Sequence, residues 1–172
     1  LGREAAAFVT AHKKEPFFLY LAYNAPHTPL QAPDNSLERV KDIKGEKLRK
    51  YGAMVCGMDD AVGELRAALK EHKLTDDTLV FFCADHGDML GERGLWYKMN
   101  FFEGSARIPL IVHAPARFRG RRVSTPVSLV DVLPTLIELS GGAVTDAVEP
   151  LAGQSLLPLC AGAAEDRTVV GE

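Results

Sequence analysis

Two short apolar segments, separated by one long amphipathic segment, limit most strongly the folds open to this chain. Residues 17–23 (FFLYLAY) and 78–84 (TLVFFCA) are apolar and show no alternation with polar residues. Such runs are typical of strands that are buried on both faces of a parallel sheet. Residues 46–72 place apolar side chains at spacings of three and four, which predicts an amphipathic helix. A strand, a helix and a strand in this order predict a right-handed parallel crossover, so the fold class is α/β.

Shorter sequence patterns predict further helices and one more strand towards both ends of the chain. The first ten residues are typical of the end of a helix, and residues 109–113 are typical of a third strand. A further helix is expected to open at Ser128, because Ser128 and Asp131 form a capping-box pattern. The glycine pair that starts at Gly141 should end this helix.

Composition excludes two classes of partner. The chain has 20 Lys and Arg against 23 Asp and Glu, a formal net charge of −3, and it lacks the basic stripe that nucleic-acid binding requires. The longest apolar run, residues 17–23, is far too short to cross a bilayer. Neither nucleic acid nor a membrane is therefore expected as a partner, and the compartment is left open.

The cysteines give little indication of function. The chain has three of them and no CxxC pair, which leaves a zinc knuckle unsupported. Cys83 lies within the second apolar segment, so a small buried thiol is the expected role of this residue.

His27 lies in a loop whose prolines restrict the backbone. The loop follows the first apolar segment, and Pro26 and Pro29 hold the chain extended near His27. In α/β sheets, ligands bind where loops leave the ends of buried strands. A histidine fixed at such a place can donate a proton to a leaving group. The alternative is an exposed loop histidine without a catalytic role.

The second apolar segment leads directly into Asp85, His86, Gly87 and Asp88. Carboxylate oxygens suit a hard divalent cation such as Ca²⁺ or Mg²⁺, and imidazole suits a softer ion or a hydrogen bond. This string predicts a metal-binding loop. The alternative is a loop whose aspartates accept hydrogen bonds from nearby backbone N–H groups.

Lys98 lies among aromatic and apolar residues, including Trp96, Tyr97, Met99 and Phe101. A partly desolvated ammonium would seek an anion, whereas the alternative is a lysine whose stem covers the rings. The rings could form a cation–π cage for a quaternary ammonium such as choline, but core packing is the preferred interpretation of them.

These residues together suggest one site. His27, the loop with Asp85 and His86, and Lys98 are expected around one edge of the sheet. A directed histidine, a cation site and an ammonium suit a tetrahedral oxyanion ester, either a sulfate or a phosphate.

Four stretches of the chain resemble the carboxyl-side part of the catalytic domain of type I sulfatases, in the alkaline phosphatase superfamily. They are PFFLYLAYNAPHTPLQAP, YGAMVCGMDDAVG, DDTLVFFCADHGDMLGERGLWYKMNFFEGSARIPLIVHAP and VSLVDVLPTLIELSG. They cover most of residues 16–142 in the family's order; residues 143–172 carry fewer matched features. Residues 85–111 look most like choline sulfatases, and the first half looks like arylsulfatases. The resemblance implies an alkaline-phosphatase-like fold, a mostly parallel sheet flanked by helices, of which residues 1–172 form the carboxyl-side portion.

The resemblance also implies a role for each candidate residue. Asp85 and His86 would hold a divalent cation, with Ca²⁺ as the first choice and Mn²⁺ or Mg²⁺ as alternatives. Many sulfatases have asparagine at the position of His86, and the Asp-His form is common among choline sulfatases and phosphonate monoester hydrolases. His27 would contact the ester oxygen and protonate the leaving alcohol, and Lys98 would bind the sulfate. The expected substrate is a small-molecule sulfate ester, and a homo-oligomer of the intact enzyme is left open.

One feature of the family is missing from these residues. Sulfatases carry a formylglycine nucleophile, made from Cys or Ser in the motif C/S-x-P-x-R near the amino end, and Cys56, Cys83 and Cys160 do not match that motif. The chain is therefore expected to be a fragment that is inactive alone. Two alternatives stay open, a phosphonate or phosphate ester hydrolase of the same superfamily and a non-catalytic remnant that binds an anion.

Overall fold

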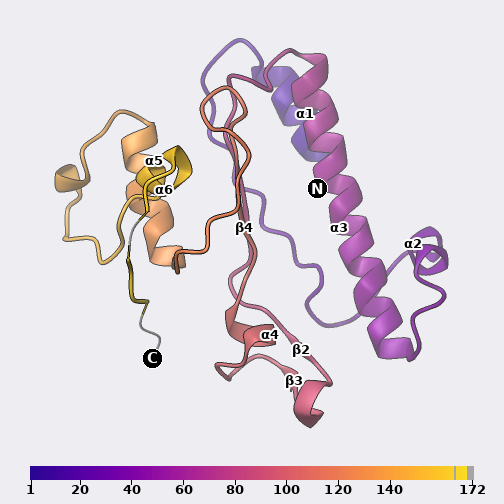
Figure 1. The fold of residues 1–172 in the computed structure, drawn as a ribbon. Coiled ribbons are helices and arrows are strands. Elements are labelled where there is room, and N and C mark those ends of the chain that lie inside the picture. The colour runs from indigo at the N-terminus through magenta and orange to yellow at the C-terminus, as the bar shows by residue number, and fades with distance from the viewer. Residues whose placement is uncertain (165, 170–172) are drawn as a thin grey trace. The chain divides into compact units, whose positions relative to one another are not determined.

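A computed structural model describes residues 1–164 and 166–169 of the chain (Figure 1). The chain forms two compact units. The first contains Leu1–Thr78 and Leu90–Trp96, and the second contains Leu79–Met89 and the residues from Tyr97 onward. Each unit is described by itself.

The first unit is built on three helices, which are α1 (Gly2–His12), α2 (Asp34–Arg39) and α3 (Glu46–Glu71). Both α1 and α2 pack against the long helix α3 (Figure 1). Ala5 and Val9 of α1 are fully buried, as is Ala53 of α3. Small side chains at these positions allow the helices to approach closely. The helices predicted for the first ten residues and for residues 46–72 are confirmed.

The first apolar segment is not a strand, and this prediction is wrong for the described residues. Residues 16–24 have no regular secondary structure and form no ladder with any described segment. Phe18 is 75% exposed and Tyr20 is 80% exposed, whereas Phe17 and Leu19 are half-buried. A strand requires a neighbour that takes up its backbone N–H and C=O groups. The described residues supply no such neighbour for this segment.

The second unit contains one ladder of four-residue strands, β1 (Val80–Cys83) and β4 (Leu110–His113). They pair antiparallel, with Val80 opposite His113 and Cys83 opposite Leu110. The second and third predicted strands are thus confirmed with shorter bounds, but the predicted parallel crossover is not formed within the described residues. Cys83 is exposed, so its expected burial is also wrong.

The remaining elements are short. They are β2 (Met89–Leu90), η1 (Glu92–Gly94), β3 (Trp96–Tyr97), α4 (Glu103–Ala106), η2 (Leu129–Asp131), α5 (Val132–Leu139), η3 (Val144–Asp146) and α6 (Leu157–Ala161). The strands β2 and β3 pair with each other as a hairpin. Among the helices of the described residues, none has the length and apolar character that a bilayer-spanning helix needs.

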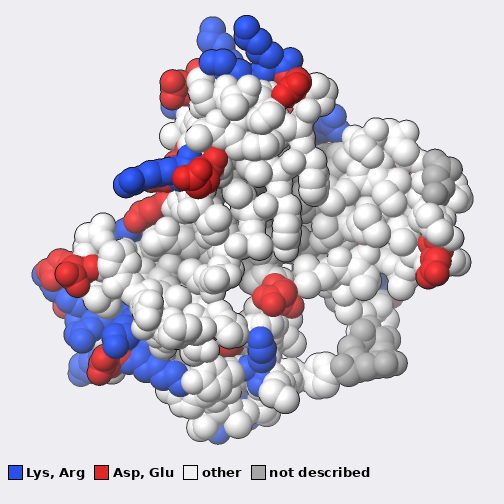
Figure 2. All heavy atoms as spheres, turned by 180° about the vertical axis from the view of Figure 1, so that it is seen from behind, with Lys and Arg blue, Asp and Glu red and all other residues white. Residues whose placement is uncertain are grey.

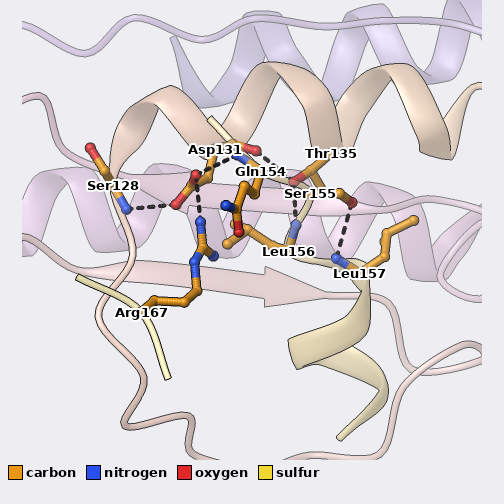
Figure 3. Close-up of polar contacts among 8 residues, drawn as sticks. All are labelled: Ser128, Asp131, Thr135, Gln154, Ser155, Leu156, Leu157 and Arg167. Carbon is orange, nitrogen blue, oxygen red and sulfur yellow. Dashed lines mark hydrogen bonds and ion pairs between the residues drawn. The ribbon is translucent and has the colours of Figure 1, made fainter. Parts of the chain in front are cut away.

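The helix predicted at Ser128 is confirmed, and it opens with the expected capping box. The backbone N–H of Ser128 donates to Oδ2 of Asp131 at 2.9 Å, and α5 ends just before Gly141. Asp131 is only 2% exposed. Its Oδ1 accepts the backbone N–H of Gln154 at 2.8 Å and pairs with Nη2 of Arg167 at 2.9 Å (Figure 3). The cap of this helix therefore also binds two residues far along the chain.

A second buried side chain continues this network. The hydroxyl of Thr135 donates to the carbonyl oxygen of Asp131 at 2.6 Å and accepts the N–H of Leu156 at 2.8 Å (Figure 3). Gly153 lies so close that an added Cβ would collide with the carbonyl oxygen of Val130. Residues 153–156 are therefore held directly against the start of α5.

Charges of both signs are interspersed on the surface. Figure 2 shows one face, on which Lys and Arg lie beside Asp and Glu. Ion pairs of the first unit include Arg39–Asp60 at 2.6 Å and Lys50–Glu46 at 2.7 Å. Exposed pairs of this kind contribute little to stability.

Candidate functional site

The loop that follows β1 brings three of the predicted residues together. Nδ1 of His86 lies 2.8 Å from the carbonyl oxygen of Gly87. A carbonyl oxygen only accepts, so Nδ1 carries the proton and the neutral ring has its lone pair on Nε2. Oδ2 of Asp85 lies 3.4 Å from this Nε2, and Nζ of Lys98 lies 2.5 Å from it. The structure thus joins the predicted metal residues and the predicted sulfate-binding lysine within the second unit.

The orientation of His86 depends on close contact between two backbone segments. The N–H of Gly87 donates to the carbonyl oxygen of Ser105 at 2.7 Å. A Cβ on Gly87 would collide with the carbonyl oxygen of Gly104. The carbonyl of Gly87 that orients the imidazole is therefore held in place by α4. Sequence reasoning did not single out Gly104 or Ser105, because spacing along the chain does not reveal which loop packs on Gly87.

Replacement of Gly87 by alanine should destabilise this loop. The colliding atom belongs to the backbone and cannot rotate away, so we expect a loss of about 1–3 kcal/mol in the free energy of unfolding. Urea denaturation measures this change. Gly120→Ala is the matched control, because a Cβ at Gly120 meets nothing within 4 Å. Equal stability of the two variants would contradict the proposed contact.

Asp85 and His86 fit two positions in the shell of one cation. Neighbouring ligands at right angles around a Ca²⁺ ion, each about 2.3–2.6 Å away, are about 3.3–3.7 Å apart. The distance between Asp85 Oδ2 and His86 Nε2 is 3.4 Å. The Asp85 side chain is 86% exposed, so its oxygens are accessible. Within residues 1–164 and 166–169, no group of three or more His, Cys, Asp or Glu side chains could hold a metal.

Cys83 is not prepared to act as a thiolate beside this pair. Desolvation, and then the nearby carboxylate of Asp85, raises the pKa of the Cys83 thiol above its ordinary value. A thiol with a raised pKa stays protonated near neutral pH and is a poor nucleophile and metal ligand.

The aromatic residues on either side of Lys98 in the sequence are exposed. Tyr97 is 49% exposed and Phe101 is 72% exposed, so the preferred interpretation of core packing is wrong for both. The ring of Trp96 is occupied by another cation, because Nζ of Lys47 lies 3.7 Å from its centroid. Lys98 itself is half-buried.

His27 belongs to the first unit. Its Nδ1 lies 2.8 Å from the carbonyl oxygen of Thr28, so Nδ1 carries the proton here as well. His27 is exposed and faces a hollow of about 470 Å³. The residues that line this hollow are Asn24, His27, Thr28, Pro29, Gln31 and Met54. The Nε2 atom of His27 thus remains available for a partner outside its own loop.

Comparison with known proteins decides the family. The family model described as Sulfatase matches residues 1–142. The chain belongs to the sulfatase family. This sulfatase chain is 44% identical over 135 residues to a choline-sulfatase of Rhizobium meliloti (strain 1021), covering 76% of the chain. It is 36% identical over 177 residues to human arylsulfatase H, covering 94% of the chain.

A solved structure supports the fold. The crystal structure of a putative sulfatase from Bacteroides fragilis matches 96% of the chain and 41% of its own length, with a TM-score of 0.82 and 27% identity. The chain is accordingly a partial α/β domain of the sulfatase fold. It spans 26% of the length of the choline-sulfatase and 30% of that of the arylsulfatase. The resemblance to choline sulfatases and arylsulfatases is confirmed.

Proposed function

We propose that residues 1–172 supply the metal-binding and sulfate-binding part of an enzyme that hydrolyses sulfate esters to an alcohol and sulfate. In this proposal they form the carboxyl-side portion of its catalytic domain. The main support is that Asp85, His86 and Lys98 meet at the end of β1 in a chain of the sulfatase family. In this proposal the intact enzyme is the polypeptide that joins these residues to a formylglycine motif.

Asp85 and His86 would bind the divalent cation. The exposed carboxylate and the Nε2 lone pair are suitable donors, with Ca²⁺ as the first candidate and Mn²⁺ or Mg²⁺ as alternatives. Such a cation would offset negative charge on the sulfate oxygens. The family's formylglycine would supply the nucleophile.

Lys98 and His27 would act on different parts of the ester. The ammonium of Lys98 would bind the sulfate oxygens and stabilise the charge that develops on them. His27, when protonated on Nε2, would donate that proton to the leaving alcohol oxygen. The hydrogen bond from Nδ1 to Thr28 fixes the ring so that Nε2 faces outward. The hollow beside His27 would then accommodate the alcohol part of the ester.

The intact enzyme is expected to prefer sulfate esters. Choline sulfate and para-nitrophenyl sulfate are the first substrates to test, because the relatives are named for choline and aryl sulfates. We expect kcat/KM for one of these to exceed that for para-nitrophenyl phosphate and a phosphonate monoester by at least about tenfold. Release of sulfate, phosphate and para-nitrophenol measures these rates.

Two other outcomes would replace the proposal. Preferential hydrolysis of the phosphate or phosphonate ester would make the protein a phosphoryl-ester hydrolase of the same superfamily. If no ester were hydrolysed, and calorimetry still detected binding of inorganic sulfate, the protein would be a non-catalytic anion-binding protein.

A further inference from the structure

We propose that Lys98 and the divalent cation compete for the same lone pair of His86, so that binding of the cation releases Lys98 to bind the anion. This inference rests on the proposed function of the site. It adds a coupling between the two ligands of the site, because the cation and the sulfate would each favour binding of the other.

The competition follows from the protonation of the imidazole. Nδ1 of His86 donates its proton to the carbonyl oxygen of Gly87, so the ring has one lone pair, on Nε2. An ammonium has no acceptor, so Lys98 must be the donor in the 2.5 Å contact between Nζ and Nε2. A cation bound by Nε2 would use the same lone pair. The two interactions therefore exclude each other.

The histidine is held more firmly than the lysine. A ring flip would break the bond between Nδ1 and Gly87, whose backbone is fixed by Ser105 and by the close approach of Gly104. When a cation binds, His86 therefore keeps its orientation and Lys98 is the side chain that moves away.

The backbone around Lys98 is suited to such a movement. Tyr97 has a φ of 69° and Met99 a φ of 78°, so two residues with side chains lie in the left-handed region on either side of Lys98. That conformation is unfavourable for residues other than glycine, and such strain often occurs at sites that change conformation. The high exposure of Met99 leaves little packing to oppose a change in this segment.

Movement of Lys98 couples the two ligands. While its ammonium contacts His86, it is not available to sulfate oxygens. A cation that displaces it makes it available, and sulfate that binds it leaves Nε2 open to the cation. Linkage requires the two effects on affinity to be equal.

Calorimetric titration of the intact enzyme with Ca²⁺, and separately with Mn²⁺, tests this coupling. The titrations are made with and without inorganic sulfate.

Loss of one hydrogen bond corresponds to about a fivefold change in affinity. We expect Lys98→Met to bind the cation about fivefold more tightly than the wild type without sulfate. Saturating sulfate should tighten cation binding by the wild type about fivefold and change that of Lys98→Met much less. Lys41→Met removes an exposed ammonium of the first unit that pairs with Glu38, and this variant should match the wild type.

A second measurement separates competition from simple repulsion between two cations. In the ¹⁵N spectrum of histidine-labelled enzyme without added metal, Lys98→Met should shift the Nε2 resonance of His86, because the donor is lost. Repulsion without a hydrogen bond predicts a much smaller shift there. An unshifted resonance, or cation affinity that is equal in wild type and Lys98→Met, would overturn the inference. Failure of both proteins to bind any cation would instead disprove the proposed metal site.

Discussion

Replacement of His27 by alanine in the intact enzyme is expected to lower kcat for an alkyl sulfate such as choline sulfate by about 10²–10⁴-fold, the usual contribution of a general acid. An alkoxide is a poor leaving group and needs the proton that Nε2 of His27 would donate. The orientation of the ring supports this role, since Nδ1 is already bound to the carbonyl of Thr28. Initial rates of sulfate release at saturating substrate measure the effect.

The dependence on the leaving group makes this prediction specific. Para-nitrophenolate leaves without much help, so the same variant should lose far less activity towards para-nitrophenyl sulfate. His12→Ala is the matched control, because His12 pairs with Glu15 at the end of α1. Equal losses on the two esters would show that His27 binds sulfate or maintains structure and does not act as the general acid. Activity within a few-fold of the wild type on both esters would show that His27 is not part of the catalytic site.

Replacement of Asp131 by alanine should strongly destabilise the protein. Asp131 is buried, and its carboxylate accepts hydrogen bonds from the N–H groups of Ser128 and Gln154 and pairs with Arg167. Removal of the carboxylate leaves a buried guanidinium without its counter-ion, so we expect a loss of about 3–5 kcal/mol in the free energy of unfolding. Urea denaturation monitored by circular dichroism measures this loss.

A double-mutant cycle with Arg167→Met separates the ion pair from the helix cap. If the pair causes most of the loss, Asp131→Ala should cost less when Arg167 is already methionine. Glu103→Ala, which breaks an exposed pair with Arg107, should leave stability unchanged within error. A loss for Asp131→Ala as small as that for Glu103→Ala would contradict the structural role assigned to the buried network.

Local patterns were predictable from sequence, whereas strand pairing was not. The apolar spacing of residues 46–72 predicted α3, and the pair Ser128 and Asp131 predicted the start of the helix that contains α5. Both features depend on residues within one or two turns of each other. Residues 17–23 look like a buried strand, but a strand also depends on distant segments that pair with it. The same reason explains Cys83, whose burial depends on what covers its face of the sheet.

The candidate site was predictable in its chemistry and only partly in its contacts. The sequence indicated that Asp85, His86 and Lys98 suit a cation and an oxyanion, and the structure brings these three together. The chemistry of these three side chains was enough to select them as candidate site residues without knowledge of the fold. The contact between Lys98 and Nε2 of His86 was not foreseen, because the segment between these residues contains a hairpin whose geometry the spacing does not specify. The placement of His27 beside them remains a prediction.

The contacts of Asp131 also determine where this polypeptide can be shortened. The family match ends at residue 142, but Gln154 and Arg167, which satisfy the buried carboxylate, lie beyond that boundary. A recombinant version cut at residue 142 would retain every matched residue but would lose two of the three partners of the Asp131 carboxylate, and only the N–H of Ser128 would remain. A shortened version that keeps the polar network at the start of α5 must therefore extend at least to Arg167.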